Sequence, residues 1–242
     1  MLAALRIILL TIISIIILLL AIVIAVFSFR NPSTNFLVAR MFKIFTPILG
    51  VKIEWKLPKN LPEGSKTYIV NHQSNYDIFV TSKMLMKRTV TLGKKSLLFV
   101  PIFGVAYWLA GNILLDRENK SKAHSSLDNI IKTIHRKKLS LWIFPEGTRS
   151  KGQGLLDFKI GAFYTAVNAN TPIIPIVISQ YDIKLNRWNN GTIICEMLDE
   201  IPIEGNSKRD SLKLMKKTHT LMSEKIQELN KEANIKVGKI NE

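Results

Sequence analysis

The sequence predicts an α/β domain, with a single sheet flanked by helices, behind an N-terminal membrane-anchoring segment. Three observations support this prediction. A long uncharged run opens the chain, short apolar runs rich in β-branched residues recur after it, and amphipathic helical patterns separate some of those runs. At 242 residues the chain is long enough for one such domain of good size.

The composition is strongly basic, with 34 Lys+Arg against 18 Asp+Glu and a formal net charge of +16. Such an excess favours an anionic partner, namely nucleic acid, an anionic lipid surface or a phosphorylated substrate. A general abundance of lysine accounts for part of it. Cys195 is the only cysteine, which excludes an internal disulfide and a cysteine-based metal site. Its apolar neighbours predict a buried strand residue.

The first element is a predicted membrane helix over residues 7–29, which carry no charge. As a helix they would span about 35 Å, more than the roughly 30 Å of a hydrocarbon core. A cleaved signal peptide is disfavoured because the run is too long and lacks a small-residue cleavage site. Arg6 alone precedes the run and several cations follow it, which places the bulk of the chain on the cytoplasmic side.

Residues 36–51 mix apolar side chains with sparse cations and are too short to span. We expect a helix at the membrane interface that Pro47 ends or kinks. Together with residues 7–29 it would form either a hairpin that dips into one leaflet or a true span. Residues 1–56 are therefore assigned to membrane anchoring and residues 57–242 to the globular domain.

The globular part alternates strands and helices. Strand-like runs occupy residues 67–70, 89–92, 112–115, 139–144, 173–179 and 192–197. Amphipathic helical patterns follow at 123–134 and 212–229. Residues 97–110 are apolar almost all round, so they form either ordinary core or a surface that enters the membrane or lines a tunnel for an alkyl chain.

Residues 71–77, Asn-His-Gln-Ser-Asn-Tyr-Asp, fall in a predicted strand-to-helix turn. His72 is suited to take a proton from a hydroxyl and return it near pH 7. Asp77 follows at a spacing that lets its carboxylate reach the imidazole Nδ1–H, which leaves Nε2 as the base. The alternative is that both residues are structural, with His72 an ordinary loop histidine and Asp77 a cap of the following helix. This alternative explains the segment equally well.

A second informative turn is Phe-Pro-Glu-Gly-Thr-Arg-Ser at residues 144–150, at the end of a predicted strand. Ligands of α/β sheets gather beyond the carboxyl ends of strands, so this turn and His72 are predicted to face one crevice. Arg149 has the donors to grip a phosphate and Gly147 lets the backbone approach a ligand. Glu146 would bind a polyol or hold Arg149.

A third strand end carries Gly111, Asp116 and Arg117, and a proline-bearing apolar strand comes last at 171–175. These blocks, in this order over essentially the whole chain, resemble the glycerolipid acyltransferase family. The likeness is greatest to bacterial 1-acyl-sn-glycerol-3-phosphate acyltransferases. Leu114 departs from the family pattern, in which an aromatic residue is common.

The resemblance implies a glycerol-phosphate acyltransferase-like fold and transfer of a fatty acyl group from an acyl thioester to the free sn-2 hydroxyl of lysophosphatidic acid, giving phosphatidic acid for phospholipid synthesis. It implies His72 as the base and Asp77 as its orienting partner. The residues that would bind the glycerol-phosphate end are Lys94, Arg117, Glu146, Gly147, Thr148 and Arg149. Pro172 and Pro175 would shape the acyl pocket.

The resemblance also implies no cofactor, because acyl-CoA or acyl carrier protein serves as donor substrate. It places the protein at the bacterial inner membrane with its domain on the cytoplasmic side, against an anionic lipid surface. A metal site is not expected, since His124, His135 and His219 are scattered. No nucleic-acid motif is present, so nucleic acid is not an expected partner.

Three other functions stay open. A sibling acyltransferase acting on glycerol-3-phosphate or on another lysophospholipid would use the same residues. A hydrolase with Ser74 as nucleophile is disfavoured because no G-x-S-x-G segment occurs. A membrane-anchored protein that only binds anionic lipid would explain the charge and the anchor, but not the pairing of His72 with Asp77.

Overall fold

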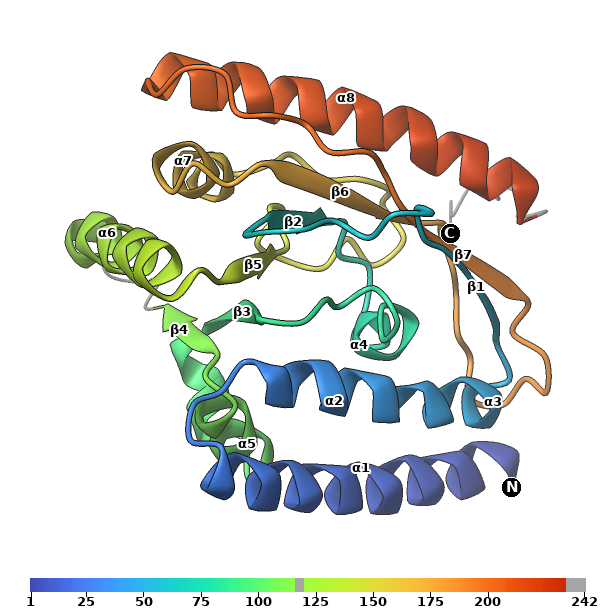
Figure 1. Cartoon of the computed structure of the whole chain (residues 1–242). Helices are drawn as coiled ribbons and strands as arrows, with labels where there is room; N and C mark the ends of the chain where they lie inside the picture. Colours follow the sequence, from blue (N-terminus) through green and yellow to red (C-terminus); the bar gives the residue numbers. More distant parts are fainter. Residues whose placement is uncertain (116–119, 234–242) are drawn as a thin grey trace.

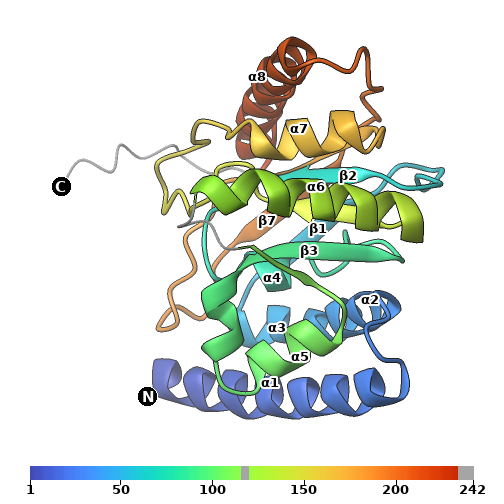
Figure 2. The ribbon, with the colours of Figure 1, turned by 90° about the vertical axis from the view of Figure 1, so that its left-hand side faces the viewer.

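The computed structural model describes the backbone of residues 1–115 and 120–233, and the side chains of 1–115 and 127–233. A seven-stranded sheet carries helices on both faces (Figures 1 and 2), which confirms the predicted α/β class. The strand order is β1-β7-β6-β2-β5-β3-β4, and every neighbouring pair is parallel except β6 with β7. The strands are β1 Lys52–Lys56, β2 Thr67–Val70, β3 Thr89–Lys94, β4 Ile113–Leu115, β5 Ser140–Ile143, β6 Ile173–Ile178 and β7 Thr192–Met197.

The six predicted strands all form, within one or two residues of the expected bounds, but β1 was not predicted. Its residues, Lys52–Lys56, lie inside the segment 1–56 that the sequence assigns to membrane anchoring. They alternate polar and apolar side chains, as an edge strand does, and pair in parallel with β7. The Trp55 indole donates to the Val80 carbonyl at 2.8 Å. A boundary after residue 56 would separate this strand from its sheet.

The sheet buries both of its faces. Helices α6 (Lys120–Lys137), α7 (Gly161–Asn168) and α8 (Lys208–Glu232) cover one face, and α2 (Ser33–Met41), α3 (Phe45–Leu49), α4 (Asp77–Val80) and α5 (Phe103–Leu109) lie on the other (Figure 1). Alternate residues of one strand serve the two cores. In β2, Ile69 packs with α7 and α8, whereas Tyr68 and Val70 pack on the opposite side. This explains why the central strands are almost uniformly apolar.

Helices α2 and α3 form an inner layer between the sheet and α1 (Leu2–Phe27), not an exposed interfacial helix (Figure 1). Phe45 and Leu49 are fully buried. A 3₁₀ turn, η1 (Phe42–Ile44), separates α2 from α3. Pro47 lacks the N–H that would bond the Lys43 carbonyl, and the Thr46 hydroxyl bonds that carbonyl instead at 3.0 Å. Pro47 therefore kinks this segment, while Gly50, with φ +67°, ends it.

Helix α1 is attached to the domain at both ends. Near its start, the Arg6 guanidinium is buried and donates to the carbonyls of Leu185, Arg187 and Trp188 in the β6–β7 loop. Just past its end, the Arg30 amide donates to the Leu109 carbonyl at 3.0 Å. Within the described chain, α1 is the one helix long and apolar enough to cross a membrane. Its outer face stays exposed along its length, through residues 5, 8, 12, 16, 19, 23 and 26.

Residues 97–110 are partly buried and partly exposed. They form a 3₁₀ helix, η2 (Lys95–Phe99), followed by α5. Ala106 and Ala110 are buried, whereas Phe99 is 80% exposed and Trp108 is 40% exposed. One side of this segment lines a cavity, and the other side continues the apolar outer face of α1.

Candidate active site

The carboxyl ends of five parallel strands meet at one edge of the sheet. His72 follows β2, Lys94 ends β3, Arg149 follows β5 and Tyr181 follows β6. His72, Lys94 and residues 147–149 line one cavity, as the crevice argument predicts. Arg117, expected at the end of β4, lies outside the described residues.

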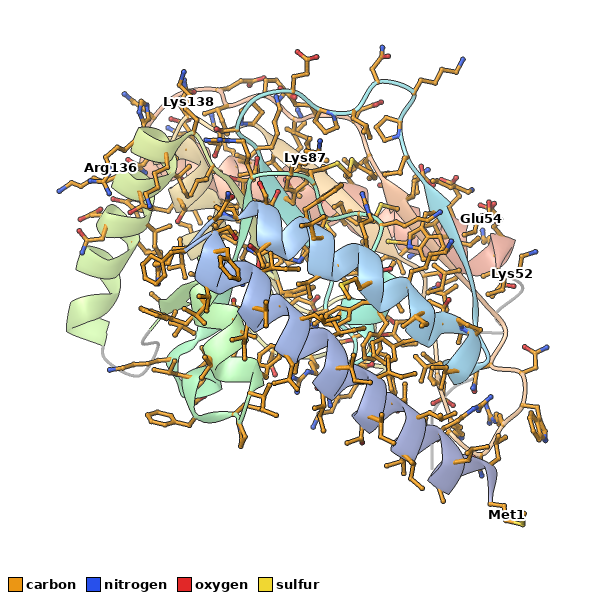
Figure 3. The ribbon with its side chains drawn as sticks, turned by 60° about the horizontal axis from the view of Figure 1, so that its bottom comes forward. Met1, Lys52, Glu54, Lys87, Arg136 and Lys138 are labelled. Atoms are coloured by element: carbon orange, nitrogen blue, oxygen red, sulfur yellow. The ribbon has the colours of Figure 1, made fainter. Side chains whose placement is uncertain are left out.

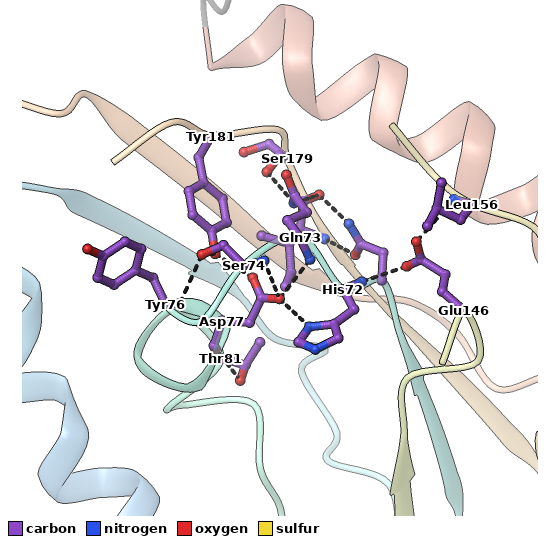
Figure 4. Close-up of polar contacts among 12 residues, drawn as sticks. His72, Gln73, Ser74, Tyr76, Asp77, Thr81, Glu146, Leu156, Ser179 and Tyr181 are labelled. Atoms are coloured by element: carbon purple, nitrogen blue, oxygen red, sulfur yellow. Dashed lines mark hydrogen bonds and ion pairs between the residues drawn. The ribbon is translucent and has the colours of Figure 1, made fainter. Parts of the chain in front are cut away.

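The expected contact between His72 and Asp77 is present. Nδ1 of His72 lies 2.6 Å from Oδ2 of Asp77 (Figure 4). A proton on Nδ1 leaves the lone pair on Nε2, and Nε2 bonds no residue of the described chain. The imidazole stacks on the Phe144 ring, with centroids 4.1 Å apart and planes 19° from parallel. The arrangement therefore fixes the ring and turns its basic nitrogen to the cavity.

Asp77 is almost completely buried, and its side chain is fully bonded. Oδ2 also accepts from the amides of Gln73 at 2.7 Å and Ser74 at 3.1 Å, and Oδ1 accepts from the Tyr181 hydroxyl. These amides precede α4, so the carboxylate serves the loop that carries His72 and does not cap the helix. Four donors around one buried carboxylate stabilise its negative charge.

Side-chain amides fix the His72 loop to β6. Asn71 donates to the Ile178 carbonyl at 3.0 Å and accepts from the Ile178 amide at 2.8 Å. The Gln73 side chain donates to the Ser179 carbonyl at 2.9 Å. The pairing of β2 with β6 thus continues past the end of β2 through side chains, which holds the loop in register with the sheet.

Glu146 also supports the loop and does not line the cavity. Its Oε1 accepts from the His72 amide at 2.6 Å and its Oε2 from the Leu156 amide at 3.1 Å (Figure 4). Burial raises the pKa of Glu146, while the two amide donors oppose that shift. The expected contact with a polyol finds no support here, because both oxygens face backbone amides. Among the described residues it forms no ion pair with Arg149.

Gly147, Thr148 and Arg149 line the cavity, and the last two side chains are exposed. Gly147 has φ +71°, a left-handed conformation that residues with a Cβ rarely adopt, which explains the glycine. Arg149 forms no ion pair or hydrogen bond with any described residue. Its planar set of donors is therefore directed to solvent and to whatever enters the cavity.

The cavity has a volume of about 700 Å³ and two chemically different ends. The polar end holds His72, Lys94 and Arg149. The mainly apolar end lies between α1, α2 and α5. Its lining includes Leu18, Ala21, Val38, Phe42 and Ala106, together with the polar side chains of Asn35 and Tyr107. Pockets of this size that combine apolar lining with placed polar groups are typical small-molecule sites.

Pro172 and Pro175, the residues expected to shape an acyl pocket, do not line this cavity. Pro175 lies in β6, where the pairing with the returning chain is irregular. Ile173 pairs with Ile201, and Ile176 pairs with Met197. The two pairs are three residues apart on β6 and four residues apart on the opposing segment, so that segment contains one extra residue. A proline without an N–H is tolerated at such a bulge.

Within the described part of the chain, no group of three or more histidine, cysteine, aspartate or glutamate residues is placed to hold a metal ion. His219 packs against the Phe158 ring, with centroids 4.7 Å apart. Cys195 is fully buried, and burial raises the pKa of its thiol, which makes it a poor nucleophile.

A comparison with protein-family models matches residues 52–179 to the family described as Acyltransferase. The chain belongs to this acyltransferase family. The match begins at the first residue of β1 and ends one residue after β6, so it spans the strands that carry His72 and Arg149. The family predicted from the sequence is thereby confirmed.

Named relatives of this acyltransferase family cover most of the chain. A 1-acyl-sn-glycerol-3-phosphate acyltransferase from Haemophilus influenzae is 46% identical over 96% of this chain and 98% of its own length. One from Escherichia coli (strain K12) is 44% identical over 85% of each chain. The crystal structure of the 1-acyl-sn-glycerophosphate acyltransferase PlsC from Thermotoga maritima superposes with a TM-score of 0.66 at 20% identity, covering 82% of this chain and 81% of that one. This likeness confirms the predicted fold.

Sequence reasoning missed two contributors to the acyltransferase site. Phe144 stands in a recognised block but had no assigned role, and Tyr181 lay outside every block. In the sequence, Tyr181 is marked only by its position directly after a strand end. That position points to the His72 site only when it is known that β6 lies beside β2.

Proposed function

We propose that this acyltransferase moves a fatty acyl group from an acyl thioester to the sn-2 hydroxyl of 1-acylglycerol-3-phosphate, giving phosphatidic acid. One observation carries the proposal. The basic nitrogen of His72 faces a cavity whose near end presents Lys94 and Arg149 and whose far end is apolar. A molecule with a phosphate, a hydroxyl and a long alkyl chain matches this arrangement: the phosphate meets the cations, the hydroxyl meets His72 and the chain meets the apolar end. The names of the relatives agree with this substrate.

The reaction needs no covalent enzyme intermediate. The acceptor hydroxyl donates its proton to Nε2 of His72 while its oxygen attacks the thioester carbonyl carbon. Asp77 stabilises the imidazolium that forms. When the tetrahedral intermediate collapses, the carbon–sulfur bond breaks and the leaving thiolate takes the proton from Nε2. The products are the ester and a free thiol, and His72 returns to its starting state.

The hydrolase alternative would require Ser74 to be activated by His72. In the structure the Ser74 hydroxyl lies 3.1 Å from the Tyr181 hydroxyl and accepts from the Tyr76 amide at 2.9 Å. No hydrogen bond joins Ser74 to His72 among the described residues. Ser74 is therefore part of the loop scaffold and not a nucleophile.

The phosphate would be bound by Arg149 and Lys94 at the polar end, with the backbone at Gly147 close to the ligand. A guanidinium offers two parallel hydrogen bonds to phosphate oxygens, which gives orientation as well as affinity. Arg117, carried over from the family pattern, belongs to the same proposal. The donor is an acyl-CoA or an acyl carrier protein, and the chemistry requires no cofactor or metal.

The membrane association that we propose is flat and confined to one leaflet, with the domain on the cytoplasmic face of the bacterial inner membrane. Viewed from the α1 side, apolar side chains cover the centre, while Lys52 and Lys87 lie at the periphery, with Glu54 beside Lys52 (Figure 3). Anionic headgroups would meet those cations. A helix attached to the domain at both ends cannot cross the bilayer without carrying the domain into it. The apolar end of the cavity reaches α1, so a lipid chain has a short path from the leaflet.

The test uses the full chain in membranes with labelled 1-acylglycerol-3-phosphate and each thioester in turn. Glycerol-3-phosphate and a choline-bearing lysophospholipid serve as parallel acceptors. The proposal predicts phosphatidic acid from the first acceptor and little product from the other two. Preferred use of glycerol-3-phosphate or of the choline lipid would establish the sibling reaction instead. Lipid binding without turnover would establish the non-enzymatic function.

A further inference from the structure

Tyr181 is a half-buried polar side chain that the mechanism above does not use. It stands in the loop after β6, and its hydroxyl donates to Oδ1 of Asp77 (Figure 4). The opposite oxygen of the same carboxylate accepts from His72 Nδ1. A single carboxylate therefore separates the Tyr181 hydroxyl from the catalytic imidazole.

We propose that Tyr181 is a positioning residue of the acyl transfer, because its hydroxyl fixes the plane of the Asp77 carboxylate that orients His72. The proposal rests on the function proposed above and adds a third side chain to the pair predicted from the sequence.

The two carboxylate oxygens of Asp77 are held by different kinds of donor. Oδ2 has three, namely the His72 ring and the amides of Gln73 and Ser74. Oδ1 has only the Tyr181 hydroxyl among the described residues. Asp77 is 1% exposed, so without that hydroxyl Oδ1 would be a buried acceptor with no partner. Rotation of the carboxylate to find another donor would disturb the bond to His72.

The hydroxyl also takes part in a directed chain of hydrogen bonds. The Tyr76 amide donates to Ser74 Oγ at 2.9 Å, and Ser74 Oγ lies 3.1 Å from the Tyr181 hydroxyl. Since the Tyr181 proton points to Asp77, Ser74 is the donor in that second contact. Successive donors that point the same way polarise and strengthen one another. The chain ends at the His72–Asp77 pair.

Tyr181 is held in place by its neighbours and remains a donor. Burial, and then the charge of Asp77, raise the pKa of the Tyr181 hydroxyl, so it stays protonated at any working pH. The Gln180 amide donates to the Asn230 side chain of α8 at 2.7 Å. Further along the loop, the Arg6 guanidinium of α1 binds the carbonyls at 185, 187 and 188. The hydroxyl is therefore preorganised in the folded protein.

The test is Tyr181→Phe in the full chain, which removes one oxygen and keeps the ring. Partners that orient a functional histidine typically account for about 10–100-fold in activity, so kcat should fall by roughly that factor. The KM for 1-acylglycerol-3-phosphate should stay unchanged, because Tyr181 does not line the cavity. Tyr76→Phe is the matched control. It removes a hydroxyl from the same region that bonds no described residue, and it should leave kcat unchanged.

A second arm introduces Tyr181→Phe into Asp77→Asn. If Tyr181 acts through the Asp77 carboxylate, the added loss should largely disappear in that background. Wild-type kcat in Tyr181→Phe, an effect on KM alone, an equal loss in Tyr76→Phe, or a full additional loss beside Asp77→Asn would each overturn the proposal. Failure of the proposed function is a separate result, because it appears as absent turnover in the wild-type protein.

Discussion

Two turns at the same edge of the sheet are built in opposite ways. The loop that carries His72 is largely shielded from solvent, and its polar groups are bonded within the protein: side chains bond the end of β6, and backbone amides donate to the carboxylates of Asp77 and Glu146. The turn at 147–149 is exposed at Thr148 and Arg149, and the Arg149 guanidinium meets no described partner. Proton transfer depends on fixed geometry, whereas capture of a flexible phosphate tolerates a mobile cation. The difference predicts that the two turns affect different kinetic constants.

The largest effect should come from His72→Ala. General-base catalysis typically contributes roughly 10²–10⁴-fold, and no second base lies against Asp77 in the described structure. Folding should be retained, since His72 stacks on a single ring and contributes little packing. Turnover and thermal unfolding of the variant check this prediction. Near-normal turnover would show that another group removes the proton.

Arg149→Ala should have the next largest effect, on binding of the acceptor. A charge-assisted phosphate contact contributes about 1.5–3 kcal/mol, or roughly 10–150-fold in KM. Arg149→Lys should recover only part, because an ammonium lacks the two-pronged geometry. Lys151→Ala is the matched control, since this exposed cation lies two residues away and does not line the cavity. Equal losses in both variants would indicate a general electrostatic effect of the surface.

Glu146→Gln should lower kcat by about tenfold, because a glutamine side chain accepts well from only one of the two amides now bonded. Stability gives an independent signature. The raised pKa of Glu146 means that the folded state binds this proton more tightly than the unfolded state does.

The stability that this carboxyl contributes is present below its unfolded pKa and is lost as the pH rises through the folded pKa. The Tm of the wild type minus that of Glu146→Gln should therefore decrease as the pH rises over the range above the ordinary glutamate pKa of about 4.3. A difference that increases over this range would mean that the amide donors outweigh burial.

The smallest effect on chemistry should come from the outer face of α1. Ile16→Glu places a charge on that face and should weaken binding to anionic vesicles by about tenfold or more, through lost apolar contact. Turnover in detergent micelles should be unchanged. Thr220→Glu, at an exposed position of α8 on the other side of the sheet, should leave vesicle binding unaltered. Unchanged vesicle binding by Ile16→Glu would contradict the flat orientation.

The parts of the fold that could be predicted are those with a local signal. β-Branched runs marked six strands, and the block around His72 marked the base and its partner. β1 was missed because three of its five residues, Lys52, Glu54 and Lys56, are charged, which obscured its alternation. Residues that lie close together in the sequence also have side chains that point in different directions. Glu146 turns into the protein and Arg149 turns outward, although one short turn carries both.

Contacts between distant segments gave no local signal. Arg6 precedes an apolar run and was counted as a flanking charge, yet its partners lie in a loop 179 or more residues later. Tyr181 reaches Asp77 across 104 residues, and only the order of the strands brings them together. These contacts decide how α1 docks and how the carboxylate is held, and neither follows from periodicity or composition.

The most direct test of the contrast between the two turns is to measure kcat and KM side by side for Asp77→Asn and Arg149→Ala. Both 1-acylglycerol-3-phosphate and a choline-bearing lysophospholipid should be used as acceptors. The structure predicts a large loss of kcat in Asp77→Asn with either acceptor, and a raised KM in Arg149→Ala with the first acceptor only. Loss of kcat alone in Arg149→Ala, or equal losses with both acceptors, would show that Arg149 supports the catalytic geometry and does not bind the phosphate.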